Sequence, residues 1–136
     1  MEKKTIQLVQ DSWKKVALIA PQAAELFYKN LFEADPSLKN LFKNDMIVQG
    51  KKLTQMLGAA VNGLNNLEKL IPVVEDLGKR HVDYGVKESQ YKTVGAALLK
   101  TLSQGLGKDF TPEVEKAWTE VYGVLSKVMI DASKRK

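Results

Sequence analysis

The chain contains one histidine, His81, and no cysteine. Sites that need two imidazoles or a thiolate are therefore excluded, and disulfides and iron–sulfur clusters with them. At helical spacing His81 shares a face with Leu70, Val74, Leu77 and Gly78. Two interpretations fit this position: a buried histidine satisfied by a hydrogen bond, which is the commoner case, or a metal ligand in an apolar wall. Such a wall with one neutral imidazole also suits a haem, because the nitrogen binds iron while aliphatic groups exclude water.

Tyr28 and Gln49 are two further polar residues on apolar helical stripes. Tyr28 follows Phe27 on the inward face of its helix, and Gln49 lies four residues before Leu53. Taken alone, Tyr28 is most simply a core tyrosine with a hydrogen-bond acceptor, and Gln49 a residue near a helix start. Together they could direct two donors into one pocket and hydrogen-bond a bound dioxygen.

The elements that position these residues are all helices, because apolar residues recur at helical spacing and no sustained period-two alternation is found. Thr111 and Pro112 have the residue types of an N-cap and first helical position, and Gly85 is a typical helix stop. Asn44 and Asp45 indicate a polar corner. The predicted helices cover 4–19, a segment from Pro21 past Leu31, a short helix from Asp35-Pro36 to Phe42, 46–64, 67–84, a segment from Tyr91 to before Gly107, and a last helix from Thr111.

Composition is that of an ordinary globular protein: 136 residues, 44% hydrophobic and 27% charged. No repeat, linker or low-complexity segment interrupts the chain, so we predict one domain over residues 1–136. The net charge of +5 comes from scattered lysines and a short cluster at 134–136, without interleaved aromatic residues, which argues against a nucleic-acid partner. No secretory apolar core or membrane span is found, and we expect a cytoplasmic protein without membrane insertion.

Several short motifs, in order and spacing, carry a resemblance over nearly the whole chain. They are Phe27-Tyr28-Lys29-Asn30-Leu31-Phe32, Pro36 with Leu41-Phe42, Gln49 with Lys52-Leu53, Leu77-Gly78-Lys79-Arg80-His81 with Gly85-Val86, and Phe110-Thr111-Pro112 with Ala117-Trp118 and Tyr122-Gly123. In these residues the chain resembles bacterial single-domain haemoglobins related to flavohaemoglobins, and its second half is also similar to neuroglobin.

This resemblance implies a globin fold, a three-over-three helical sandwich around haem b, which is iron protoporphyrin IX. It makes His81 the proximal iron ligand and Phe42 the aromatic residue on the haem face. Tyr28 and Gln49 become the distal pair that hydrogen-bonds the ligand, with Leu53 as the apolar distal residue. The other implied haem contacts are Leu57, Leu77, Val86, Val94 and Tyr122, with Lys52 and Arg80 as candidate partners of the propionates.

Two departures from the related families have consequences. Neuroglobin-like chains often have a histidine where this chain has Gln49, so here the ferrous iron should be five-coordinate unless Tyr28 or Lys52 occupies the sixth position. Flavohaemoglobins surround the proximal histidine with a tyrosine and a glutamate; Tyr91 matches the tyrosine, but Ser133 stands at the glutamate position. Asp131 is close in sequence but falls on another helix face. Without a carboxylate partner the imidazole should donate less electron density, which argues against peroxidase-like chemistry.

The function implied is reversible binding of dioxygen, and of nitric oxide and carbon monoxide, for storage, supply or transport. Nitric oxide dioxygenation is the enzymatic alternative, and whether the protein is an enzyme stays open. Because no nucleotide-binding loop is found in the 136 residues, the reductase that this activity needs would act in trans. Gas sensing and a haem-free helical module are the remaining alternatives.

Overall fold

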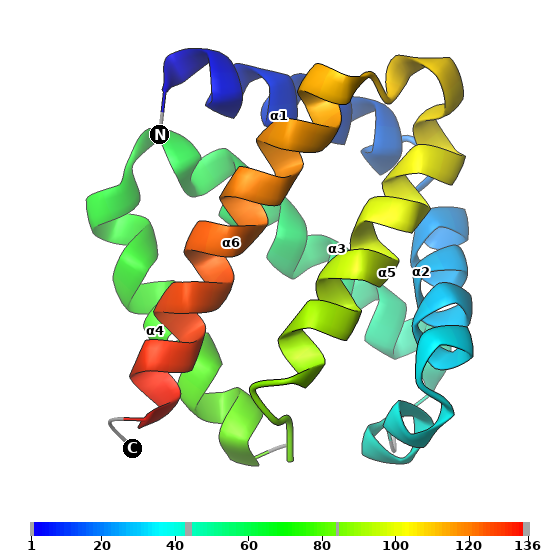
Figure 1. Ribbon diagram of the computed structural model, residues 1–136, viewed down its shortest axis with the longest axis vertical. Coiled ribbons are helices and arrows are strands. Elements are labelled where there is room, and N and C mark those ends of the chain that lie inside the picture. The colour runs from blue at the N-terminus through cyan, green and yellow to red at the C-terminus, as the bar shows by residue number, and fades with distance from the viewer. Residues whose placement is uncertain (1, 43–44, 84, 135–136) are drawn as a thin grey trace.

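Helices account for nearly all of the computed structural model, which describes residues 2–42, 45–83 and 85–134 (Figure 1). No strand occurs among these residues, and the predicted all-α class is confirmed. None of the helices in the described ranges is long and apolar enough to cross a membrane. The elements are α1 (Lys3–Ala17), α2 (Ala20–Ala34), η1 (Pro36–Leu41), α3 (Met46–Asn62), η2 (Gly63–Asn65), α4 (Leu67–Asp83), α5 (Gln90–Leu106), η3 (Gly107–Asp109) and α6 (Pro112–Lys134).

The observed helix ends differ from the predicted ones by only a few residues. The first helix was expected to reach residue 19 but ends at Ala17, because Ile19 leaves the helical conformation (φ −120°, ψ 34°) ahead of Pro21. Proline has no N–H and is tolerated best in the first turn of a helix, which is where Pro21 lies in α2. The helix expected over 46–64 is α-helical to Asn62 and then tightens into η2. Residue 44 of the predicted corner, residue 84 and the terminal pair 135–136 lie outside the described residues.

At three helix starts, side-chain oxygens accept hydrogen bonds from backbone N–H groups. Thr111 Oγ1 accepts from the N–H of Val114 at 3.2 Å, and Asp35 Oδ1 accepts from the N–H of Ser37 at 3.1 Å. Asp45, expected only in a corner, also caps α3, because its Oδ1 accepts from the N–H of Ile47 at 2.7 Å. Each bond satisfies a donor that has no partner inside the helix.

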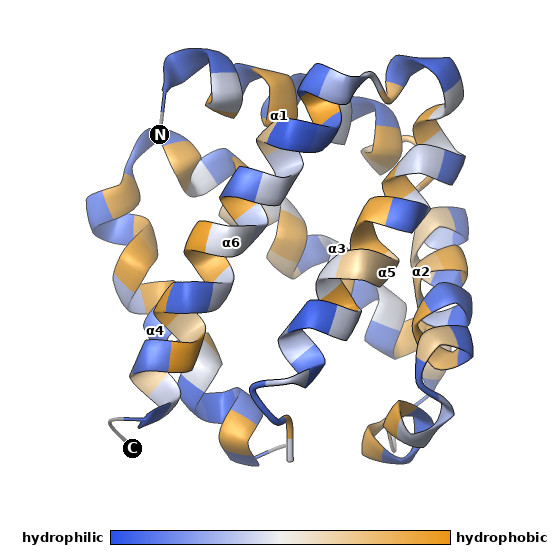
Figure 2. Ribbon diagram, in the orientation of Figure 1, coloured by the Kyte–Doolittle hydropathy of each residue, from blue (hydrophilic) through white to orange (hydrophobic). Residues whose placement is uncertain are grey.

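The helices form two layers of three, with α1, α3 and α4 against α2, α5 and α6. The main packed pairs are α4 with α6, α2 with α5, α1 with α6 and α2 with α3. Figure 1 shows α5 and α6 in front of α3, with α1 crossing one end. Apolar and polar segments alternate along α5 and α6 in Figure 2, as expected for helices that bury one face.

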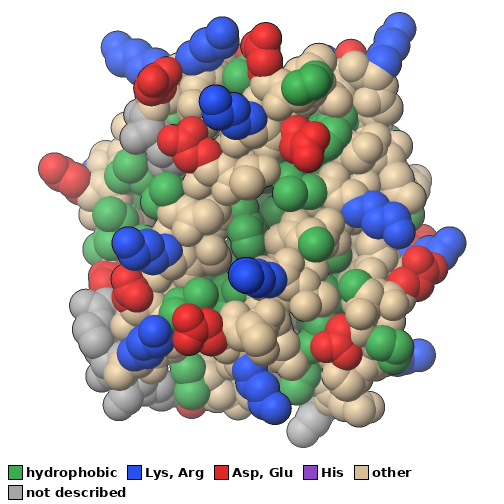
Figure 3. All heavy atoms as spheres, viewed as in Figure 1, with side chains coloured by type: hydrophobic (Ala, Val, Ile, Leu, Met, Phe, Trp, Pro, Cys, Tyr) green, Lys and Arg blue, Asp and Glu red, His purple; other side chains and the backbone are tan. Residues whose placement is uncertain are grey.

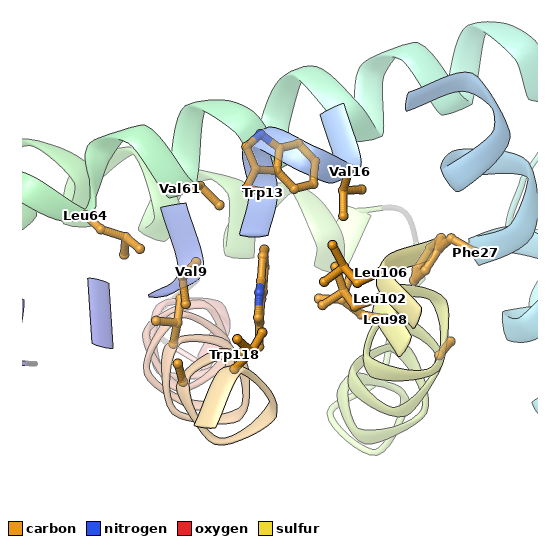
Figure 4. Packing of buried hydrophobic residues seen from close by; sticks show 14 of the residues in the cluster. Val9, Trp13, Val16, Phe27, Val61, Leu64, Leu98, Leu102, Leu106 and Trp118 are labelled. Carbon is orange, nitrogen blue, oxygen red and sulfur yellow. The ribbon is translucent and has the colours of Figure 1, made fainter. Parts of the chain in front are cut away.

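Two tryptophans tie α1 to α6 in the core (Figure 4). The ring centroids of Trp13 and Trp118 are 6.3 Å apart at an interplanar angle of 55°. The indole N–H of Trp118 donates to Ser12 Oγ at 2.8 Å, and that hydroxyl donates to the carbonyl of Leu8 at 2.7 Å. The polar atoms of this buried contact therefore have partners, as burial requires.

A small apolar pocket of about 30 Å³ lies between α1, α2, α3 and α5. Its two polar lining residues, Thr54 and Thr101, donate their hydroxyls to the carbonyls of Gly50 and Ala97 in their own helices. The other lining side chains are hydrocarbon or aromatic: Trp13, Val16, Ala20, Ala23, Ala24, Phe27, Leu53, Leu57, Leu98 and Leu102.

At Gly78 the backbones of α4 and α6 touch. A Cβ atom placed on Gly78 would collide with the main-chain carbonyl and Cα of Met129. Because the obstacle is backbone, it cannot rotate away. Gly78 is therefore required for α4 to pack this closely on α6.

Replacing Gly78 with alanine tests this crossing. We expect Gly78→Ala to lower the free energy of unfolding by about 1 to 3 kcal/mol, the cost of overpacking a core contact. Gly123→Ala is the matched control, because Gly123 also lies inside α6 but has no atom within 4 Å of its Cβ position. That control should gain up to about 1 kcal/mol from better helix propensity. Equal urea midpoints for both variants would contradict the close crossing.

Candidate functional site

His81 lies in the last turn of α4 and is half-buried. Its Nδ1 is 2.8 Å from the carbonyl oxygen of Leu77, one turn earlier. A carbonyl can only accept, so this contact selects the tautomer with the proton on Nδ1 and the unprotonated lone pair on Nε2. Burial lowers the pKa of His81 below its usual value, which favours the neutral ring. Neutral imidazole is the form that binds metals.

The end of α4 fixes the direction in which the chain leaves this residue. The N–H of Val86 donates to the carbonyl of His81 at 3.0 Å, and Gly85 has a φ of +87°. Only glycine adopts that conformation without strain, so the predicted stop at Gly85 is a real helix terminus. On the opposite face, Arg80 pairs with Asp76 at 3.2 Å, and both side chains are exposed.

Tyr91, at the start of α5, faces the imidazole from another helix. Its ring lies 6.3 Å from that of His81 at an interplanar angle of 30°. The hydroxyl of Tyr122 donates to the main-chain carbonyl of Tyr91 at 2.6 Å. Ser133 donates to the carbonyl of Ile130 in its own helix at 2.6 Å.

Tyr28 forms the second polar point of the site and is only 6% exposed. Its ring stacks on Phe32, with centroids 6.0 Å apart at 24°, and meets Phe42 edge to face at 5.3 Å. The hydroxyl is 3.5 Å from the main-chain carbonyl of Gln49 at the start of α3. Burial raises the pKa of Tyr28 to about 12, so at neutral pH this group is a protonated donor.

The apolar side chains predicted as haem contacts keep part of their surface exposed. Leu41, next to Phe42, lies 3.5 Å from the Cβ position of Gly85 and so joins the aromatic cluster to the end of α4. Figure 3 shows hydrophobic side chains in a hollow between α5 and α6. The half-buried apolar residues predicted as contacts are Phe42, Leu53, Leu57, Leu77, Val86 and Val94.

This arrangement fits a haem by its chemistry. An imidazole with its proton on Nδ1 offers a nitrogen ligand, and partly exposed apolar side chains from several helices suit a flat hydrophobic ring. The carbonyl behind Nδ1 is the kind of partner that fixes a ligating histidine in orientation. Tyr28 adds a protonated hydroxyl that lies near the start of α3.

The globin family model matches residues 25–129 of the chain. The chain belongs to the globin family. The resemblance found in the motifs and the three-over-three fold are thereby confirmed, and the family implies a haem cofactor.

Individual relatives agree with this assignment. Flavohemoproteins of Bacillus thuringiensis subsp. konkukian and Rhodopirellula baltica are 33% and 32% identical, each over 96% of this chain. The chain spans about a third of the length of these relatives, with 33% covered in each. Among solved structures, a bacterial globin from Campylobacter jejuni is 30% identical with a TM-score of 0.84, over 98% of this chain and 97% of that one. An engineered carbene transferase from Rhodothermus marinus shares the fold, with a TM-score of 0.88 at 24% identity, over 99% of this chain and 94% of that one.

The predicted site residues divide into two groups. His81 lies with Leu77 and Tyr91, and Tyr28 lies with Phe42 and the Gln49 main chain. Lys52 and Arg80, the candidate propionate partners, are exposed, and their predicted role is still a prediction.

Two features were not predicted. Phe32 stacks on Tyr28, a contact that its spacing of four residues on one helix could have revealed. The bond from Tyr122 to the Tyr91 main chain had no signal in the sequence, because it joins two helices through a backbone atom.

The raised pKa of Tyr28 predicts a loss of stability in alkali. Above pH 10 the unfolded tyrosine releases its proton while the folded one, with a pKa of about 12, keeps it, so the free energy of unfolding falls as pH rises. From pH 9 to 11.5 we expect Tyr28→Phe to lose about 2 kcal/mol less than the wild-type protein. Urea unfolding at both pH values measures this difference. Parallel pH dependences would show that the hydroxyl is not buried.

Proposed function

We propose that this globin binds one haem b through His81 and reversibly binds dioxygen, and also carbon monoxide and nitric oxide, for storage, supply or transport. The observation that carries the proposal is the half-buried His81 whose Nδ1 proton is directed at the Leu77 carbonyl. The family supports the cofactor, and residues 1–136 are proposed to act as one globin domain.

Bound haem would supply a ferrous iron that can bind a diatomic gas. The chain's own residues would then have three tasks. His81 would hold the iron through Nε2, since Nδ1 is engaged with the main chain. Leu53, Leu57 and Val94 exclude water with apolar surface. Tyr28, protonated at neutral pH, offers a hydrogen bond to a polarised ligand, with Gln49 close to its hydroxyl.

Haem titration of purified protein tests the cofactor assignment. We expect a Soret band that saturates at one haem per chain, and in His81→Gly a displaced band because the axial nitrogen is lost. Added imidazole should restore the wild-type spectrum in that variant by occupying the vacated volume. A wild-type protein without a Soret band, or identical spectra for wild-type and His81→Gly, would overturn the proposal.

Replacing Tyr28 tests the ligand side. A hydrogen bond to a charged group contributes about 1.5 to 3 kcal/mol, so Tyr28→Phe should weaken dioxygen binding roughly 10- to 100-fold, mainly through faster dissociation. Carbon monoxide is the internal control, because it accepts hydrogen bonds weakly and its dissociation should change less. An unchanged dioxygen dissociation rate, measured by stopped flow, would remove Tyr28 from the ligand site.

A further inference from the structure

Helix α4, which carries His81, and helix α5, which carries Tyr91, are held together mainly by their packing on α6. α4 packs on α6, and α5 packs on α2 and α6. Between α4 and α5, the ring contact of His81 with Tyr91 is the direct side-chain link described above. The orientation of Tyr91 relative to the imidazole therefore depends on how each helix is held on α6.

Tyr122 holds the first turn of α5 by a hydrogen bond to the main chain. Its hydroxyl donates to the main-chain oxygen of Tyr91 at 2.6 Å, a short hydrogen bond for a phenol. In an α-helix the same oxygen faces the N–H of the residue four positions on, which is Gly95. Tyr122 thus binds to a backbone atom whose position is already set by the helix, and the bond fixes the turn as a unit.

Gly95 provides the space for this contact. A Cβ atom on Gly95 would lie 2.6 Å from Cε2 of the Tyr122 ring, closer than real side chains allow. The phenol ring therefore lies against the bare backbone of α5. The glycine that admits the ring and the carbonyl that accepts its proton are one helical turn apart, so ring and hydroxyl act on the same turn.

We propose that Tyr122 is a positioning residue for the proximal histidine. Its hydroxyl holds the first turn of α5, and with it the Tyr91 ring, against the imidazole of His81. On its other side, the imidazole is directed by Leu77 of its own helix. The ring of His81 is thus oriented both by its own helix and by α6 acting through α5. This inference rests on the proposed function, in which His81 binds the haem iron.

Tyr122→Phe is the informative variant, because it removes the hydroxyl and leaves the ring in the Gly95 slot. In the resonance Raman spectrum of the ferrous protein, we expect the iron–histidine stretching band to shift or to split, because the imidazole is less uniquely oriented. Amide hydrogen exchange at residues 91–95 should accelerate about 2- to 10-fold, as expected when one hydrogen bond is lost.

A double-mutant cycle separates positioning from general stability. Tyr91→Leu removes the ring through which Tyr122 acts, so Tyr122→Phe should move the Raman band in the wild-type background and leave it unmoved in Tyr91→Leu. Trp118→Phe is the matched control: it removes a buried hydrogen bond one turn earlier on α6 that is directed at α1. It should lower the unfolding midpoint and leave the Raman band in place.

The possible results have distinct meanings. A normal wild-type band that does not change in Tyr122→Phe would overturn this inference alone. Equal shifts in both backgrounds, or the same shift in Trp118→Phe, would also overturn it, because the effect would then be structural. A wild-type protein without an iron–histidine band would overturn the proposed function together with this inference.

Discussion

Where Gly78 lies on Met129, the backbone of α4 rests directly on the backbone of α6. No side chain separates the two helices there, so the distance between α4 and α6 is set by main-chain contact and not by flexible side chains. His81 lies three residues after Gly78 on the same helix, and its position depends on that contact. α6 is also bonded to α1 through Trp118 and to α5 through Tyr122. One helix thus provides a common frame for the proximal side.

The two sides of the site are held by different kinds of interaction. On the His81 side two polar contacts end on main-chain carbonyls, at Leu77 and Tyr91, whose positions are set by their helices. On the Tyr28 side the ring is held by aromatic neighbours, and its hydroxyl contact of 3.5 Å is long. A firmly held imidazole, with a tyrosine donor that has room to adjust, suits the proposed site, which would hold a cofactor permanently and a gas transiently.

Much of this could be predicted from the sequence because the signals are local. The apolar stripes, Thr111 with Pro112, and Gly85 define helices and their ends through neighbouring residues alone. Asp45 shows the limit of such reasoning: a corner residue and an N-cap have the same composition, and only the backbone geometry distinguishes them. The hydrogen bond of Tyr122 could not be predicted, since its acceptor is a main-chain carbonyl, which every residue has. The close contacts at Gly95 and Gly78 could not be predicted either, because the sequence does not distinguish a glycine that permits close packing from one that ends a helix.

The small apolar pocket between α1, α2, α3 and α5 relates the packing of the core to the effect of hydrostatic pressure. This pocket of about 30 Å³ is lined by residues of four helices, so it marks a place where their apolar faces do not pack fully against one another. Hydrostatic pressure favours states in which unfilled volume is removed. Leu53 and Leu57 line this pocket and are also proposed to exclude water from the bound ligand, so pressure should act on the pocket and on the proposed ligand side through the same two side chains. The packing of this globin is thus incomplete next to residues of its proposed haem site.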